Sequence, residues 1–194
     1  NYGRTINQSS LISSIIYDTI TSTEEEQVLL FCYYLMRNYY LCAKRLYQAY
    51  EEWLITQANS FDGNVHFIDL KCGPATFGLA FYEQFKDNIH LTYTGIDGSL
   101  EMRTMGNKMI NDVCGEDVNA FFLESIQDLD DDYIESISKE PTLTIFNMAY
   151  LFSNIDSEFS EKLANHIIDI MQNINYNKNN YVGGIFGKEV QKKT

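Results

Sequence analysis

The stretch from Val65 to Phe85 constrains the fold of this chain more than any other. It begins with a short apolar run, Val65 to Leu70, which carries Asp69 near its end, and a turn with Gly73 and Pro74 follows. Apolar residues then recur at helical spacing as Phe77, Phe81 and Phe85. This order predicts a β-strand, a tight turn and an α-helix. In a parallel α/β sheet such a joint faces the crevice at the carboxyl ends of the strands, where ligands bind.

Beyond this joint, apolar runs suited to strands alternate with helical patterns. Further strands are expected at residues 91–97, 118–123, 142–147 and 181–186, and helices at 99–111 and 156–173. The second of these helices is expected to turn inward Phe159, Leu163, Ile167, Ile170 and Ile174. An Asn-rich stretch, residues 173–180, is expected to be a loop. Alternation of this kind implies βαβ crossovers, so the predicted fold class is α/β with a mostly parallel, twisted sheet flanked by helices.

The first 60 residues differ in character, and we expect an N-terminal helical extension or lid at 1–60, followed by the ligand-binding domain at 61–194. Thr23 and Glu26 form a capping-box pattern before residues 24–59, which contain neither glycine nor proline. One long helix is expected there, or two with a break near Arg37 and Asn38. Its expected apolar face comprises Val28, Phe31, Leu35, Tyr39, Cys42, Leu46, Ala49 and Trp53. A short helix is expected at 11–20.

Tyrosine is unusually frequent in the long helical stretch. The six residues are Tyr33, Tyr34, Tyr39, Tyr40, Tyr47 and Tyr50. One interpretation is amphipathic packing, with the rings buried and the hydroxyl groups in water. The other is a lid whose tyrosines, together with Arg37 and Arg45, reach into a ligand site. Both interpretations stay open, and such an aromatic surface also suits a protein partner.

Charge and cysteine content narrow the classes of function. The net charge of −13 disfavours nonspecific nucleic-acid binding, unless Lys44 and Arg45, or Lys188, Lys192 and Lys193, form a local basic patch. The four cysteines form no C-x-x-C pair and the three histidines are scattered, so no metal site is expected. No apolar run approaches the ~18 residues of a membrane span, and the chain shows no signal-peptide pattern. We expect a cytoplasmic protein that does not associate with membranes.

Asp97 is a second acidic residue at a strand end, 28 residues after Asp69, which is the length of one βαβ unit. An acidic side chain there can accept hydrogen bonds from both hydroxyl groups of a ribose. A turn of small residues after the preceding strand lets the backbone approach the rest of a cofactor. Together these features predict a nucleoside-containing ligand laid across the strand ends. The competing interpretation is that both aspartates only cap turns.

Four segments resemble class I S-adenosylmethionine-dependent methyltransferases. F-I-D-L-K-C-G-P-A-T is similar to the first motif of that family, and Y-T-G-I-D-G-S-L-E-M to the segment with the ribose-binding acid. F-F-L-E-S-I-Q-D-L is similar to the third strand and the adenine-side loop, and T-I-F-N-M-A-Y-L-F-S-N to the fourth strand and its catalytic-side exit. The resemblance covers residues 64–186. It implies a Rossmann-like fold, S-adenosylmethionine as the cofactor, and S-adenosylhomocysteine as the product.

The resemblance also assigns roles to individual residues. Asp69 orders the turn and meets the cofactor's amino group, directly or through water, while Gly73 and its neighbours contact the methionine part. Asp97 holds the ribose hydroxyl groups. The whole expected cofactor-binding set is Asp69, Lys71, Gly73, Pro74, Asp97, Gly98, Ser99, Met102, Ser125, Ile126, Asn147 and Met148. The candidate catalytic residues are Asn147 and Tyr150.

For some of these residues ordinary packing is a competing interpretation. Ser125 and Ile126 are expected to flank the adenine, and Met148 is expected near the methyl donor, but each also suits a packing role. Tyr150 either orients a methyl acceptor or forms part of a wall.

The sequence departs from the family at two of the three motif glycines, where Lys71 and Ala75 stand. The ammonium group of Lys71 points either to solvent or toward a bound carboxylate. Asn147 to Tyr150 also lacks both prolines of the N-P-P-Y motif, which argues against a standard exocyclic amine methylase of DNA or RNA. We therefore expect a methyltransferase whose acceptor is a small molecule, a protein or RNA. The alternative is a catalytically inactive, methyltransferase-like binding or interaction protein.

Overall fold

A parallel β-sheet of five strands forms the centre of the computed structural model, which describes residues 23–130, 132–133, 141–149, 157–178 and 182–185. The strands are β1 (Asn64–Leu70), β2 (His90–Ile96), β3 (Val118–Leu123), β4 (Leu143–Asn147) and β5 (Val182–Ile185). They lie in the order β3-β2-β1-β4-β5, and every neighbouring pair is parallel. The chain builds outward from β1 to β3 and then returns to the other side of β1. The strand order therefore reverses between β1 and β4, where ligands bind in open α/β sheets.

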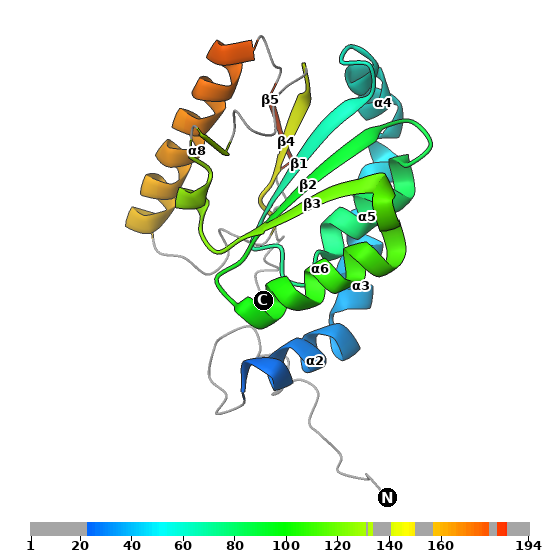
Figure 1. The fold of residues 1–194 in the computed structure, drawn as a ribbon, viewed down its shortest axis with the longest axis vertical. Helices are drawn as coiled ribbons and strands as arrows, with labels where there is room; N and C mark the ends of the chain where they lie inside the picture. Colours follow the sequence, from blue (N-terminus) through cyan, green and yellow to red (C-terminus); the bar gives the residue numbers. More distant parts are fainter. Residues whose placement is uncertain (1–22, 131, 134–140, 150–156, 179–181, 186–194) are drawn as a thin grey trace, which may run out of the picture.

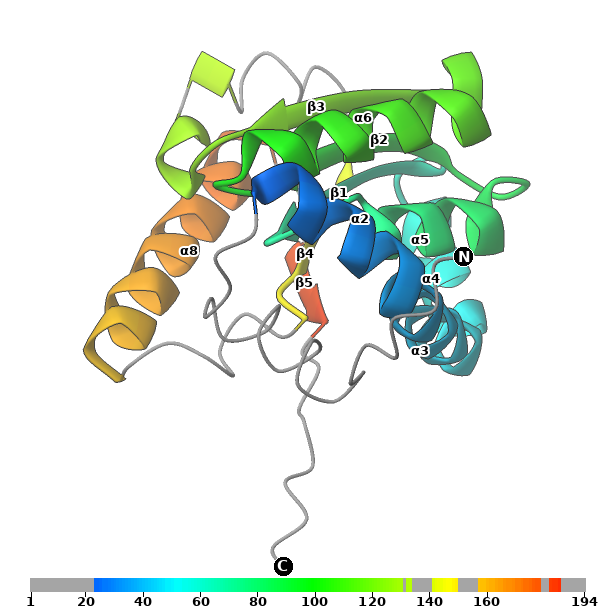
Figure 2. The ribbon, with the colours of Figure 1, turned by 90° about the horizontal axis from the view of Figure 1, so that it is seen from below.

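Helices cover both faces of the sheet (Figures 1 and 2). One face carries α3 (Met36–Ala49), α4 (Glu51–Asn59), α5 (Thr76–Phe85) and α6 (Leu100–Cys114), and the other carries α8 (Ser157–Lys178). Side chains of a strand alternate between faces, so Val65 and Phe67 enter the core beneath α3 to α6 while Ile68 and Leu70 enter the core beneath α8. The predicted Rossmann-like α/β fold class is confirmed.

The N-terminal helical stretch begins where the sequence predicts. The side chain of Thr23 accepts a hydrogen bond from the backbone N–H of Glu26 at 3.3 Å, and the Glu26 carboxylate accepts one from the N–H of Thr23 at 3.2 Å. The stretch is divided into three helices, because α2 (Glu24–Tyr34) ends at Leu35 and α3 ends at Tyr50. The expected break near Arg37 and Asn38 is therefore misplaced by about half a turn, and the second break was not predicted.

Beyond the first break, the residues that face the core differ from those expected. Val28 and Leu35 are buried as expected, but beyond Leu35 the buried residues are Ala43, Tyr47, Leu54 and Ala58. The expected positions Cys42, Ala49 and Trp53 are exposed. The shift arises beyond the break at Leu35, because Tyr47 and Leu54, on either side of the second break, are seven residues apart, as on one continuous helical face. Residues of α3 and α4 thus share the core of the sheet, while the division of the chain at residue 60 stays a prediction.

The tyrosines of these helices have different environments. Tyr47 is fully buried, with its ring in edge contacts with Phe67, Phe81 and Phe85. Tyr33, by contrast, is 81% exposed. Tyr47 therefore packs in the core, but its hydroxyl group is buried as well and donates to the backbone oxygen of Phe77 at 3.5 Å instead of facing water. The exposed tyrosines keep the interpretation of a lid or partner surface open.

Two helices run further than expected. α6 continues past residue 111 to Cys114, because the effective stop is Gly115, a glycine with a left-handed φ of 59° just after the helix. α8 continues to Lys178, so the Asn-rich stretch expected as a loop is helical over 173–178. Asparagine costs a helix at most about 0.7 kcal/mol per residue relative to alanine, too little to end an established helix. The core positions Ile167 and Ile170 are buried as predicted.

The helix expected at 11–20 and the basic residues Lys188, Lys192 and Lys193 lie outside the described residues. Within the described ranges, no helix combines the length and the apolar character needed to cross a membrane.

Candidate functional site

The turn between β1 and α5 follows an unusual backbone path. Lys71, Gly73 and Ala75 have φ angles of 56°, 53° and 59°, in the left-handed region. These are the three positions at which the methyltransferase motif carries glycine. A residue with a β-carbon pays roughly 1–2 kcal/mol for this conformation. The chain therefore adopts left-handed backbone at all three positions, although only one of them, Gly73, is a glycine.

Asp97 lies immediately after β2 and joins this turn to the next one. One carboxylate oxygen accepts a hydrogen bond from the N–H of Gly73 at 3.0 Å, and the other accepts one from the N–H of Ser99 at 3.0 Å. The guanidinium group of Arg103 donates to the backbone oxygen of Asp97. An ionised carboxylate offers about four acceptor positions. Asp97 thus organises two neighbouring turns and still has acceptor capacity for two hydroxyl groups of a ligand.

Asp69 is buried within β1, with 1% of its surface exposed. One carboxylate oxygen accepts a hydrogen bond from the Tyr93 hydroxyl group at 3.0 Å, and the other from the Asn147 side-chain amide at 2.6 Å. Burial raises the pKa of Asp69 to about 7; the hydrogen bonds from Asn147 and Tyr93 oppose this rise, and the charge of Asp97 adds to it. Asp69 therefore links β1 to β2 and β4, and its contact with a cofactor amino group stays a prediction.

The space in front of two glycines at this edge is open. A β-carbon added at Gly73 would have the Met102 sulfur as its nearest neighbour, at 4.0 Å, and one added at Gly98 would meet no described atom within 4 Å. At Gly78, inside α5, a β-carbon would instead lie 2.2 Å from the ring of Tyr93. The close approach at Gly78 serves internal packing, whereas Gly73 and Gly98 leave room for a ligand beside Asp97.

The segment after β3 contains the residues expected beside an adenine. The Ser125 hydroxyl group caps η2 (Ile126–Asp128) by accepting from the N–H of Gln127 at 3.4 Å, and the Asp128 carboxylate accepts from the N–H of Ser125 at 2.9 Å. Ile126 is half-buried against the core beneath α8. The structure thus places both residues at the carboxyl end of β3, where each also has a local structural role.

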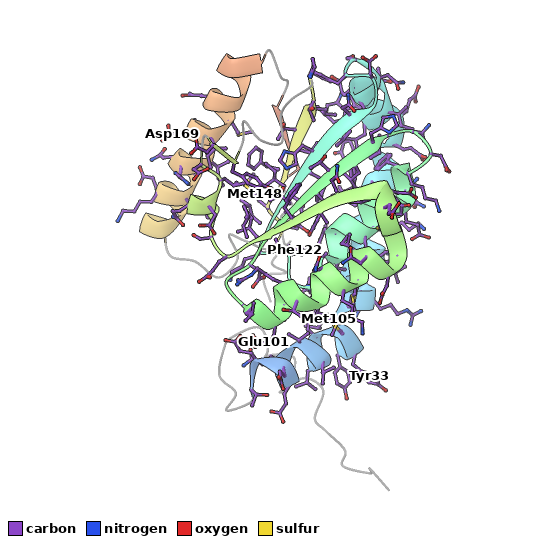
Figure 3. The ribbon with its side chains drawn as sticks, in the orientation of Figure 1. Tyr33, Glu101, Met105, Phe122, Met148 and Asp169 are labelled. Atoms are coloured by element: carbon purple, nitrogen blue, oxygen red, sulfur yellow. The ribbon has the colours of Figure 1, made fainter. Side chains whose placement is uncertain are left out.

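The end of β4 is more deeply buried than its expected catalytic role suggests. Asn147 is 2% exposed, and its side-chain amide is bonded to Asp69. Met148 is 4% exposed and packs in the core beneath α8, as Figure 3 shows. Tyr150, the other candidate catalytic residue, lies outside the described residues. Roles for Asn147 and Met148 near a methyl donor stay predictions.

The remaining expected residues lie around the β1–α5 turn. Lys71 is exposed and forms no salt bridge with a described residue, while Pro74 is buried. Ser99 caps α6 by accepting a hydrogen bond from the N–H of Met102 at 3.3 Å. No group of three or more histidine, cysteine, aspartate or glutamate side chains in the described part of the chain could hold a metal ion.

Sequence reasoning missed two residues of this site. Tyr93 is fully buried in β2, where it donates to Asp69. The one sequence signal for this buried ring is Gly78, which has no side chain where the ring packs against α5. Glu24, the first residue of α2, accepts a hydrogen bond from the Ser99 hydroxyl group at 3.2 Å. The N-terminal extension therefore reaches the β2–α6 turn, and Figure 3 shows Glu101 on the part of α6 that α2 approaches.

No protein-family profile and no curated protein matches this sequence. Among solved structures, the chain is similar to PKMT2 from Rickettsia typhi, with 22% identity and a TM-score of 0.43 over 56% of this chain and 19% of that one. WbdD is similar at 17% identity and a TM-score of 0.47, over 84% of this chain and 34% of that one. An O-methyltransferase family protein from Burkholderia thailandensis is similar at 13% identity and a TM-score of 0.42, over 84% and 46%.

The chain thus spans between 19% and 46% of the length of these solved structures. PKMT2 has also been solved with AdoHcy, and this chain is 23% identical to that structure with a TM-score of 0.41.

Proposed function

We propose that this chain binds S-adenosylmethionine and transfers its methyl group to an acceptor. The observation that carries the proposal is the position of Asp97, directly after β2, with its carboxylate hydrogen-bonded to Gly73 in the left-handed turn after β1. Both groups lie at the carboxyl edge of a parallel sheet, next to the point where the strand order reverses.

The residues around Asp97 fit a nucleoside bearing an amino-acid chain. The free acceptor positions of Asp97 suit the two ribose hydroxyl groups, and the open backbone at Gly73 and Gly98 lets the ligand approach. Ser125 and Ile126 then flank the adenine from the neighbouring strand end. S-adenosylmethionine carries no phosphate, so it depends less than a dinucleotide on a complete set of glycines.

In the proposed reaction, a lone pair of the acceptor forms a bond to the methyl carbon while the carbon–sulfur bond breaks. The sulfur keeps that electron pair, and S-adenosylhomocysteine leaves as a neutral thioether. Alignment of the two reactants can supply much of the catalysis, and a base is required only when the acceptor must lose a proton. Small molecules, proteins and RNA are candidate acceptors, and the net charge of −13 places RNA last.

Isothermal titration calorimetry with S-adenosylmethionine and S-adenosylhomocysteine tests the binding step. Replacing Asp97 by Asn keeps the size of the side chain but removes its charge, and a hydrogen bond to a charged group contributes about 1.5–3 kcal/mol. We therefore expect at least roughly tenfold weaker binding by Asp97→Asn. Asp112→Asn, an exposed position near the far end of α6, is the matched control and should bind as the wild type does. Absence of binding up to millimolar ligand would remove the proposal.

One observation favours a second candidate, a methyltransferase-like protein that binds the cofactor without turnover. Asn147, the expected polar residue at the end of β4, is withdrawn from the edge by its bond to Asp69. The exposed side chains of Leu29 and Tyr33 on α2 would then serve a protein partner. Cofactor binding without S-adenosylhomocysteine formation on small-molecule, protein and RNA pools would favour this candidate. Turnover on any pool would exclude it.

A further inference from the structure

A chain of three polar side chains crosses the sheet on the face that α8 covers. The Tyr133 hydroxyl group lies 2.9 Å from the Thr94 hydroxyl group in β2, which lies 2.7 Å from the Nε2 atom of His66 in β1. Tyr133 follows β3 in the sequence, so these hydrogen bonds join the segment after β3 to β2 and β1. Figures 1 and 2 both place this segment beside α8.

His66, the inner end of this series of hydrogen-bonded side chains, is buried and uncharged. His66 is 4% exposed, and burial lowers its pKa to about 3, so the imidazole is neutral at physiological pH. A nitrogen of the neutral imidazole ring forms one hydrogen bond with the Thr94 hydroxyl group. Thr94 is itself fully buried. Tyr133 is thus anchored to a rigid part of the sheet through two buried side chains.

The described residues between β3 and Tyr133 make contacts at several positions. Ser125 and Asp128 form the cap described above, and Leu129 is 3% exposed in the core beneath α8. The N–H of Tyr133 donates to the Asp130 carboxylate at 2.8 Å. The Tyr133 ring also meets the ring of Phe121 in β3 edge-on, with centroids 5.9 Å apart. The segment is therefore tied to the sheet at its start by β3 and at its end by Tyr133.

We propose that Tyr133 is a positioning residue for the ligand of this edge. Through Thr94 and His66, Tyr133 fixes the segment 125–130 and thereby sets the positions of Ser125 and Ile126. This inference rests on the proposed function, in which these two residues flank the adenine. A segment held in its binding conformation loses less conformational freedom when the ligand binds. Tyr133 touches no ligand in this account and acts on affinity through the segment alone.

Tyr133→Phe removes the hydroxyl group and leaves Thr94 its bond to His66. Tyr82→Phe is the matched control, because the Tyr82 hydroxyl group donates at 3.0 Å to Asp117, which lies directly before β3 and so at the amino ends of the strands. A single hydrogen bond is worth about 0.5–1.5 kcal/mol, so we expect Tyr133→Phe to weaken S-adenosylhomocysteine and adenosine alike by about two- to tenfold. Tyr82→Phe should leave both affinities unchanged. The titrations are run well below the melting midpoints of both variants, so that each is folded.

Amide hydrogen exchange over residues 124–130, without ligand, separates anchoring from binding. We expect faster exchange there in Tyr133→Phe, a similar or larger increase in Thr94→Val, and no increase in Tyr82→Phe. Unchanged exchange in Tyr133→Phe, or unchanged affinity for both ligands, would overturn the inference. If the wild type binds neither ligand, the proposed function fails and the ligand role of Tyr133 fails with it, whereas the exchange data still decide whether Tyr133 anchors the segment.

Discussion

Replacing the buried Asp69 by Asn should change how the stability of this protein depends on pH. Asp69 is 1% exposed and accepts hydrogen bonds from Tyr93 and Asn147, and burial raises its pKa from 3.8 to about 7. Asn has nearly the same shape and keeps a carbonyl oxygen that can accept one of these bonds, but it does not titrate. The substitution therefore removes the proton equilibrium and largely preserves the packing.

The expected size follows from linkage between protonation and folding. Because the pKa of Asp69 is higher in the folded state, its stabilising contribution is complete below the unfolded value of 3.8 and is lost as the pH rises through about 7. Lowering the pH from 8 to 5 should thus raise the free energy of unfolding by about 2–3 kcal/mol through this group.

His66 opposes this change, since its pKa falls from 6.5 to about 3 in the folded state. Its contribution is present above 6.5 and is lost as the pH falls toward 3, which removes about 2 kcal/mol over the same interval from pH 8 to pH 5. In the wild type the two buried groups should therefore nearly cancel.

Urea unfolding at pH 8 and pH 5 separates the two contributions. Relative to the wild type, going to pH 5 should cost Asp69→Asn about 2–3 kcal/mol of stability, whereas His66→Gln should gain about 2 kcal/mol. All other titrating groups are common to the three proteins and cancel in the comparison. An equal pH response of Asp69→Asn and wild type would show that Asp69 is ionised in the fold and would refute the reasoning.

Three further predictions concern backbone strain at Lys71, packing at Gly78 and helix capping at Thr23. Lys71→Gly should relieve the left-handed strain and raise stability by about 1 kcal/mol, or about 2–4 °C in melting temperature, whereas Lys71→Ala keeps the strain and should not. Gly78→Ala should lower the free energy of unfolding, measured with urea, by roughly 2 kcal/mol or more, because the added β-carbon would lie 2.2 Å from the Tyr93 ring. Thr23→Ala should reduce stability by about 1 kcal/mol through loss of the capping box, measured by thermal unfolding and contradicted by an unchanged midpoint.

The strand–turn–helix joint was predictable from sequence because its signals are local. The apolar run that ends at Leu70, the turn at Gly73 and the helical spacing of Phe77, Phe81 and Phe85 each report on a few consecutive residues. Ser99 was expected at the start of the next helix for the same reason, and it caps α6 in the structure. Local patterns thus placed Asp69 in the first strand and Asp97 at the end of the second, and in the structure Asp97 directly follows β2.

The partners of Asp69 were not predictable, because they depend on which strands become neighbours. Tyr93 is 24 residues away and Asn147 is 78 residues away, and they meet Asp69 only because β2 and β4 both pair with β1. The N-terminal helices failed for a related reason. Their sequence carries no glycine or proline at Leu35 or Tyr50, so no helix-breaking residue marks either break, and beyond Leu35 the buried positions fall one residue later than expected, at Ala43 and Leu54.

The turn after β1 explains why counting glycines is a poor test of this kind of site. Hydrogen bonds hold its path: the N–H of Cys72 donates to Ile96 at 3.1 Å, the N–H of Ala75 donates to Cys72 at 3.1 Å, and Gly73 donates to Asp97. Each contributes about 0.5–1.5 kcal/mol, more where the acceptor is charged, which is enough to offset left-handed strain of roughly 1–2 kcal/mol at a residue with a β-carbon. A glycine is needed only where something must come close to the backbone. Of the three motif positions, the one that keeps glycine is Gly73, the position beside Asp97 with open space in front of it.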